Sequence, residues 1–461
     1  MTLASPAPRP SSSEDARLRA LAEDVLARCR QGGASAAELG LNIDQGLAVN
    51  VRLGEVETLE HTRDRGLSLT VYIGQRKGSA SSADLSEASI AATIAQALDI
   101  ARYTEPDPCA GLADPERLAR VFHELDLWHP EAPDAAAAIE AARRCEAAAL
   151  ALDPRIRNSE GAGLNWSRGH ALYANSHGFF GAEVGTRYSL SCAVVGGEGE
   201  GMQRDYHYSS ARAYAELDRP EDIGREAARR TLSRLGARPL STRECGVIFD
   251  AELARGLFGS LVSAVSGGAL YRKATFLLDA QGQQLFPSWL QIDERPHLKR
   301  GVGSANFDND GVATQAAPLI ADGVLTRYVL GTYSARKLGL SSTGNAGGVH
   351  NLCVSANAGT LDELFAEMSR GLYVTEVLGQ GVNLVTGDYS RGAAGYWIEG
   401  GRIAHPVEEI TIAGNLRSMY AGIRAIGREM DLRGNVRTGP VWIDSMTVAG
   451  GMTDDEAEDE A

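Results

Sequence analysis

The polar residues best suited to binding chemistry lie in two glycine-rich stretches of the C-terminal half. The first stretch reads Thr343-Gly344-Asn345-Ala346-Gly347-Gly348-Val349-His350-Asn351. Glycine has no Cβ, so a second backbone can come close to it, as happens when a guest peptide adds to the edge of a sheet. Gly347, Gly348, His350 and Asn351 are therefore candidate substrate-binding residues.

The second stretch begins with Gly379-Gln380-Gly381-Val382-Asn383 and leads to Thr386-Gly387-Asp388-Tyr389-Ser390-Arg391-Gly392-Ala393-Ala394-Gly395. A guanidinium can hold a peptide carboxylate through two parallel hydrogen bonds, so Asp388, Arg391 and Gly392 complete the candidate set. Two plainer interpretations stay open. Asp388 and Arg391 can form an internal salt bridge, and the glycines can occupy turns with positive φ.

His350 admits three roles: a structural or interface residue, a substrate contact, or a metal ligand together with Cys353. In an extended strand, side chains three residues apart point to opposite faces. That geometry disfavours shared metal ligation by His350 and Cys353.

A second candidate metal motif is His123-Glu124-Leu125-Asp126-Leu127-Trp128-His129. Two histidine ligands on one helical face need a spacing near one turn, whereas six residues rotate the second histidine by about 600°, well off the face of the first. Pro130 also disfavours helix at His129. We expect a strand that runs into a proline-rich turn.

Residues 251–266 are expected to form a helix that leads into Gly267-Gly268-Ala269-Leu270-Tyr271-Arg272-Lys273. This segment contains neither histidine nor cysteine. Serine side chains do not hold Zn²⁺ as imidazole or thiolate does, and Glu252 alone is not a ligand set. We therefore assign no catalytic residue and no metal ligand to this chain.

Five segments in this order resemble the TldD/PmbA family, and within it the PmbA (TldE) branch. They are Ser-Gly-Gly-Ala-Leu-Tyr-Arg-Lys from Ser266, Thr-Gly-Asn-Ala-Gly-Gly-Val-His-Asn from Thr343, Gly-Gln-Gly-Val-Asn from Gly379, Thr-Gly-Asp-Tyr-Ser-Arg-Gly-Ala-Ala-Gly from Thr386, and Glu-Glu-Ile-Thr-Ile-Ala-Gly-Asn from Glu408.

The resemblance implies a subunit of a heteromeric, zinc-dependent metallopeptidase that acts on unfolded peptides or small proteins. In TldD-type subunits, the helix before the Arg-Lys pair carries the metal-binding H-E-x-x-x-H. The same helix here has no histidine, which fits the PmbA branch. The implied partner is a TldD-like subunit that holds the zinc, and no cofactor is expected in this chain.

The composition and net charge of the chain also argue against nucleic-acid and membrane partners. The chain has 461 residues, 44% of them hydrophobic, and a net charge of −15. An acidic protein is a poor ligand for nucleic acid, and no segment reaches the roughly 18–20 apolar residues of a membrane-spanning helix. The six cysteines include no C-x-x-C pair, and residues 1–13 lack the apolar core of a signal peptide. We expect a cytoplasmic protein with reduced thiols and no membrane or nucleic-acid partner.

The pattern of apolar residues predicts an α+β fold, with two small N-terminal α/β units followed by a β-rich C-terminal domain. The expected divisions are a disordered tail (1–13), an N-terminal α/β domain (14–125), a central α/β domain (126–238), the β-rich domain (239–450) and an acidic tail (451–461). Strands are expected over 38–44, 48–56, 66–73 and 76–82, forming an antiparallel meander. Ser86 and Asp134 are expected to cap helices.

One alternative from a different functional class stays open. The chain can be a non-catalytic, homo-oligomeric protein that binds peptides or serves as a scaffold, and a homodimer of the isolated chain fits either function. A peptidase active on its own would need ligands that this sequence lacks.

Overall fold

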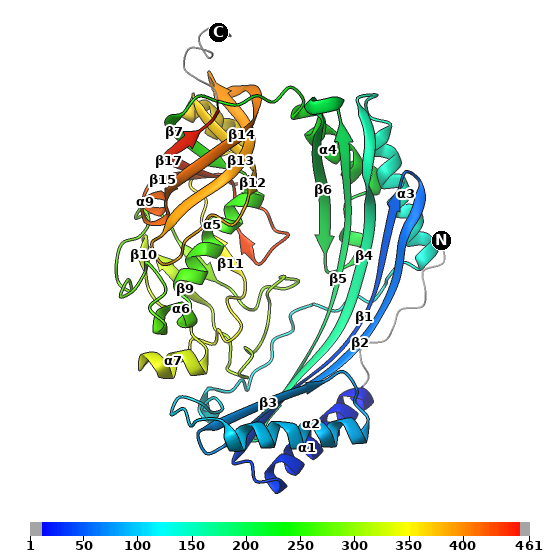
Figure 1. Ribbon diagram of the computed structural model, residues 1–461, viewed down its shortest axis with the longest axis vertical. Helices are drawn as coiled ribbons and strands as arrows, with labels where there is room; N and C mark the ends of the chain where they lie inside the picture. Colours follow the sequence, from blue (N-terminus) through cyan, green and yellow to red (C-terminus); the bar gives the residue numbers. More distant parts are fainter. Residues whose placement is uncertain (1–11, 452–461) are drawn as a thin grey trace.

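The computed structural model describes residues 12–451, which form an α+β protein of two lobes (Figure 1). Residues 1–11 and 452–461, most of the two expected tails, lie outside the described residues. Helix α1 begins at Ser12, earlier than the predicted start at residue 14. Among the described residues, no helix is both long and apolar enough to cross a membrane.

The N-terminal lobe contains one six-stranded antiparallel sheet in the order β3-β2-β1-β4-β5-β6. Strands β1 and β4 pair along most of their length, so the two expected N-terminal α/β units share this sheet. The strands are β1 (Ala36–Arg52), β2 (Glu55–Ile73), β3 (Arg76–Ser82), β4 (Ile156–Asn175), β5 (Phe180–Gly196) and β6 (Gln203–Ala211).

Helices cover one face of this sheet. Most odd-numbered residues of β1, among them Leu39 and Leu47, are buried beneath the helices, whereas Glu38 belongs to the opposite face, as the two-residue repeat of a strand requires. The helices are α1 (Ser12–Gln31), α2 (Glu87–Tyr103), α3 (Ala135–Leu150) and α4 (Pro220–Ser233), with single 3₁₀ turns at Pro115–Arg117, Gly199–Gly201 and Tyr214–Glu216. Ser86 and Asp134 cap α2 and α3 as predicted.

Two sequence expectations for this lobe are wrong. The runs 38–44 and 48–56 are not separate strands, because Gly46 lies inside β1 and pairs with both neighbours, Thr62 on β2 and Ser167 on β4. Sheet pairing on both sides overrides the local preference of glycine for a turn. Residues 118–134 form irregular backbone rather than the expected strand at His123.

The C-terminal lobe is rich in strands, as predicted. Its larger sheet has the order β14-β13-β12-β7-β17-β15, and β14 also pairs with β17, so the sheet curls round on itself. Its strands are β7 (Arg243–Phe249), β12 (Gly371–Leu378), β13 (Asp388–Glu399), β14 (Arg402–Asn415), β15 (Ile423–Ile426) and β17 (Val441–Ala449).

A smaller sheet, β10-β9-β8-β11-β16, and five helices complete this lobe. The short strands are β8 (Ile292–Glu294), β9 (Ala317–Ala321), β10 (Val324–Leu325), β11 (Leu352–Val354) and β16 (Val436–Arg437). The helices are α5 (Ala251–Ala264), α6 (Gly267–Tyr271), α7 (Thr332–Leu338), α8 (Leu361–Met368) and α9 (Leu416–Ala421).

The lobes contact each other at both ends of the sheet. At the end near β6, Gln203 Nε2 donates to Glu408 Oε2 over 2.7 Å. Near α7, Arg336 Nη2 donates to the carbonyl of Leu112 over 2.7 Å. Between these joints the helix-free face of the sheet lies toward the C-terminal lobe (Figure 1).

Candidate functional site

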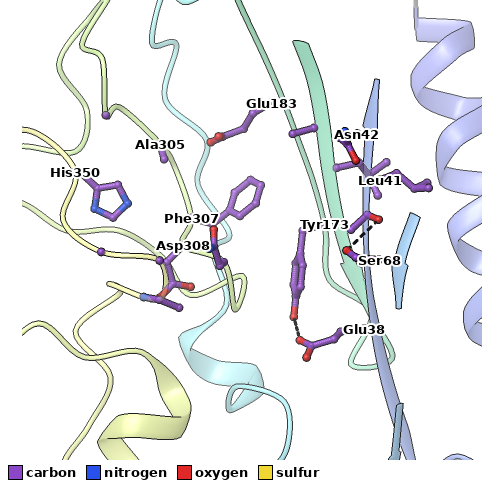
Figure 2. A pocket seen from close by; sticks show the side chains of 18 of the residues that line it. Glu38, Leu41, Asn42, Ser68, Tyr173, Glu183, Ala305, Phe307, Asp308 and His350 are labelled. Atoms are coloured by element: carbon purple, nitrogen blue, oxygen red, sulfur yellow. Dashed lines mark hydrogen bonds between the residues drawn. The ribbon is translucent and has the colours of Figure 1, made fainter. Parts of the chain in front are cut away.

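A cavity of about 670 Å³ lies between the two lobes. Strands β1, β2, β4 and β5 form one wall, and the loops around Asp308 and His350 form the other (Figure 2). The wall from the sheet contributes Glu38, Tyr173 and Glu183, all on the face that the helices leave open.

The first glycine-rich stretch wraps around one buried carboxylate, that of Glu294 on β8, which is 1% exposed. Asn345 Nδ2 donates to Glu294 Oε1 over 2.8 Å, and the backbone N of His350 donates to the same oxygen over 2.7 Å. Gly347 and Gly348 have φ of 95° and 118°, which lets the loop turn back between these two donors. Arg327 pairs with the other carboxylate oxygen.

The pair Glu294 and His350 fixes the orientation of the imidazole. His350 Nδ1 lies 2.9 Å from Glu294 Oε1. Burial opposes the charge of Glu294, but the hydrogen bond from His350 and the attraction of Arg327 outweigh burial and lower the pKa of Glu294. In a neutral imidazole with its proton on Nδ1, that proton is donated to the ionised carboxylate, and Nε2 is then a hydrogen-bond acceptor in the cavity wall.

Asp308 connects the two loops of this wall. Its Oδ1 accepts from the backbone N of Asp310 and of Val312, and its Oδ2 accepts from the backbone N of Ala346, all over 2.8–2.9 Å. Burial, aided by repulsion from Asp310, raises the pKa of Asp308 to about 7 despite these hydrogen bonds. The turn at Asp308 therefore serves to position the glycine-rich loop.

The two carboxylates of the opposite wall are also partly desolvated. Glu38 accepts hydrogen bonds from the hydroxyls of Tyr72 and Tyr173 over 2.9 and 2.6 Å. Oε1 of Glu183 accepts from the backbone N of Asn306 over 2.9 Å. Burial raises the pKa of Glu38 and of Glu183 above the usual range.

The structure separates the predicted site residues into two groups. Gly347, Gly348 and His350 line the cavity. Asn351 is fully buried beside it and binds protein groups: Oδ1 accepts from the backbone N of Gly303, and Nδ2 donates to Arg295 O and Ser304 Oγ.

The second glycine-rich stretch lies elsewhere, on β13 of the larger C-terminal sheet. Asp388 accepts hydrogen bonds from Thr386 Oγ1 and Asn415 Nδ2, whereas Arg391 Nε donates to the carbonyl of Leu378. The two side chains thus bind separate partners. Gly392 is in the middle of the same strand and does not line the cavity.

Helix α5 contains neither histidine nor cysteine. Ser260 and Ser263 donate their hydroxyls to carbonyls of the helix itself, at Gly256 and Gly259. Glu252 accepts from the hydroxyl of Tyr206 and pairs with Arg433. Over residues 12–451, no group of three or more His, Cys, Asp or Glu side chains could hold a metal ion.

Sequence reasoning missed several residues that line the cavity and others that hold its loops in place. Glu38 and Glu183 have a signal in the strand alternation, which places them on the helix-free face. Glu294 and Arg327 have no local signal, because their roles depend on a loop that is distant in sequence. Asp308 begins an Asp-Asn-Asp-Gly run, whose residue types are typical of a turn between strands, and the structure has a turn at residues 309–310.

Comparison with known proteins defines the class. Domain profiles of the PmbA/TldA metallopeptidases match in succession: domain 1 over residues 37–101, the central domain over 128–235 and the C-terminal domain over 242–450. The chain belongs to the TldD/PmbA metallopeptidase family.

Three individual proteins illustrate the relationship. The metalloprotease PmbA of Escherichia coli O157:H7 is 50% identical over 419 residues, covering 91% of this chain and 93% of PmbA. A crystal structure from Bacteroides thetaiotaomicron, of a protein described as a candidate modulator of DNA gyrase, is 28% identical with a TM-score of 0.90, covering 96% of this chain and all of that one. TldE of Thermococcus kodakarensis shares the fold, with 20% identity and a TM-score of 0.82 over 93% of this chain and all of TldE.

Proposed function

We propose that this chain is the metal-free subunit of a two-subunit zinc metallopeptidase that hydrolyses unfolded peptides or small proteins. Its relatives carry the name metalloprotease, yet its own helix α5 contains neither histidine nor cysteine, whereas the family resemblance implies a metal-binding H-E-x-x-x-H in this helix of TldD-type subunits. This mismatch is the observation that carries the proposal, since a peptidase family member without ligands needs them from another chain.

In this assignment the zinc and the water that it activates belong to a TldD-like partner, and the present chain contributes binding and enclosure. The cavity between the lobes supports that division. Its walls combine the helix-free face of a sheet, a glycine-rich loop and an imidazole held by Glu294, which are groups that can bind and orient a peptide.

The test uses both chains from the same organism. Each is purified alone and as a co-expressed pair, and hydrolysis of a fluorogenic unfolded peptide is measured with and without a zinc chelator. We expect a stable complex, chelator-sensitive hydrolysis by the pair, and none by this chain alone.

Two results would contradict the proposal. The first is that this chain does not bind the TldD-like protein and forms only homo-oligomers that bind peptide. That result would favour a scaffolding role. The second is chelator-sensitive hydrolysis by the isolated chain.

A further inference from the structure

The cavity between the lobes presents hydrogen-bond acceptors on both of its walls. His350 is 9% exposed, and its Nε2 has no hydrogen-bond partner among the described residues while Nδ1 is held by Glu294. Across the cavity, Glu183 uses Oε1 to accept from Asn306, and its Oε2 accepts no hydrogen bond from the described residues. Figure 2 shows Glu183 extending from the sheet toward the loops that carry Phe307 and His350.

The charges of the wall have one sign. Glu38, Glu183 and Asp308 line the cavity, and no lysine or arginine is found among the described residues that line it. Two groups lower the pKa of Glu183 by electrostatic attraction, His350 and then Arg212. The guanidinium of Arg212 donates to the carbonyls of Thr186, Gly301 and Val302 and so is already engaged. Lys77 also lowers the pKa of Glu38 by electrostatic attraction, but Lys77 is not one of the residues that line this cavity.

Burial makes these carboxylates costly to ionise. The pKa of Glu38 and of Glu183 is raised chiefly by desolvation, and that of Asp308 reaches about 7 for the same reason. A cation bound among them would offset this cost and favour their ionised forms. An anion bound there would instead be disfavoured, because hydrogen-bond acceptors and negative charge lie on both walls.

We infer that this cavity binds the ammonium group of a peptide, either a free N-terminal α-amino group or the ε-amino group of a lysine. Oε2 of Glu183 and Nε2 of His350 accept its N–H donors. The ring of Phe307, which also lines the cavity, offers a face for a cation. A divalent metal is not favoured, since the described residues contain no group that could hold one.

The inference names the substrate chemistry of the proposed peptidase and to that extent rests on the proposed function. Its test, however, needs only the isolated chain and no hydrolysis. Four peptides of equal length carry a C-terminal fluorophore. They have a free or acetylated N-terminus, and at the centre either lysine or norleucine, whose unbranched apolar side chain lacks the ammonium group. Their affinities are measured by fluorescence anisotropy at pH 7, where a free α-amino group is mostly protonated.

We expect the peptide with neither ammonium group to bind at least about tenfold more weakly than the peptide with both, a difference of about 1.4 kcal/mol. The two peptides with one ammonium group identify the source. If only acetylation weakens binding, the site holds the N-terminus; if only norleucine does, it holds lysine. Equal affinity of all four peptides, or no binding of any, overturns the inference without affecting the proposed partnership.

Variants locate the site. Glu183→Gln keeps the hydrogen bond to Asn306 and removes the charge, and His350→Asn can still donate to Glu294 while losing Nε2. Both should lower the tenfold discrimination to about twofold or less, because each removes an acceptor for the ammonium group. The control Glu367→Gln alters an exposed carboxylate on α8 and should keep the full discrimination. A folded Glu183→Gln protein that discriminates as well as the control would also overturn the inference.

Discussion

The imidazole of His350 and the carboxylate of Glu294 form a buried pair, with Nδ1 2.9 Å from Oε1. The same oxygen accepts the backbone N–H of His350 and the side-chain amide of Asn345. One carboxylate on β8 therefore determines both the path of the glycine-rich loop and the direction in which the imidazole faces the cavity.

Glu294→Gln should destabilise the protein strongly. The substitution keeps the size of the side chain but leaves Arg327, whose side chain is 15% exposed, without its carboxylate. Breaking a buried pair from one side typically costs about 3–5 kcal/mol. Urea unfolding followed by circular dichroism measures this loss.

The matched control is Glu399→Gln. Glu399 pairs with Arg370 over 4.0 Å, and both side chains are more than half exposed, so the expected cost is about 0–1 kcal/mol. Equal losses for the two variants would show that Glu294 does not hold the loop.

Gly347→Val and Gly392→Val should behave differently, although both residues were predicted to bind substrate. Gly347 has φ of 95°, and a Cβ there would come within 2.4 Å of Asn309 Nδ2, so valine should destabilise the fold by about 1–3 kcal/mol. Gly392 is in a strand, and a Cβ added there would lie 3.3 Å from Leu378 Cβ. The side chain of Leu378 would have to move by only a few tenths of an ångström.

The measurement for these glycines compares thermal unfolding with peptide binding for each variant. Peptide binding should fall with the folded fraction for Gly347→Val and stay near that of the wild type for Gly392→Val. A Gly392→Val protein that is fully folded but no longer binds peptide would instead support the strand edge at β13 as the peptide site.

Local signals account for the parts of this protein that the sequence predicts well. The helices after Ser86 and Asp134 were predicted because a capping side chain needs only the next turn of backbone. The glycine-rich loop with His350 was identifiable as a candidate site for the same reason. Its unusual φ angles are encoded by neighbouring glycines.

The remainder depends on contacts between distant segments. Gly46 continues β1 because two other strands pair with it, which no local pattern reveals. Glu294 precedes His350 by 56 residues in a segment that has no motif of its own. The alternation of β1 and β5 indicates that Glu38 and Glu183 leave the helical core. Only the docking of the second lobe shows that they face a cavity.

The isolated chain should bind no stoichiometric zinc. Ser260 and Ser263 of α5 donate hydrogen bonds to carbonyls of their own helix. Cys353 lies in β11, where burial raises the pKa of its thiol and so disfavours the thiolate that a metal needs. Elemental analysis after dialysis against excess zinc is the measurement. One tightly held Zn²⁺ per chain, lost on His350→Ala or Cys353→Ser, would refute this prediction.

The stability of the protein should contain a contribution from Asp308 that decreases as the pH rises. Its folded-state pKa is about 7, raised from the usual value near 3.8, so between these values the folded state binds a proton that the unfolded state has lost. Unfolding therefore releases this proton in that pH range, and a rise in pH favours the unfolded state. The stabilising contribution is fully present below about pH 4 and is lost as the pH rises through 7. The rise in pKa corresponds to a stability contribution of at most about 4 kcal/mol.

We therefore expect the free-energy cost of Asp308→Asn, which cannot ionise, to be larger at pH 5 than at pH 8. Urea unfolding of wild type and variant at both pH values measures the difference, and subtracting one protein from the other removes the groups that they share. A cost that is equal at the two pH values, or larger at pH 8, would mean that the three backbone N–H groups keep Asp308 ionised in the folded protein.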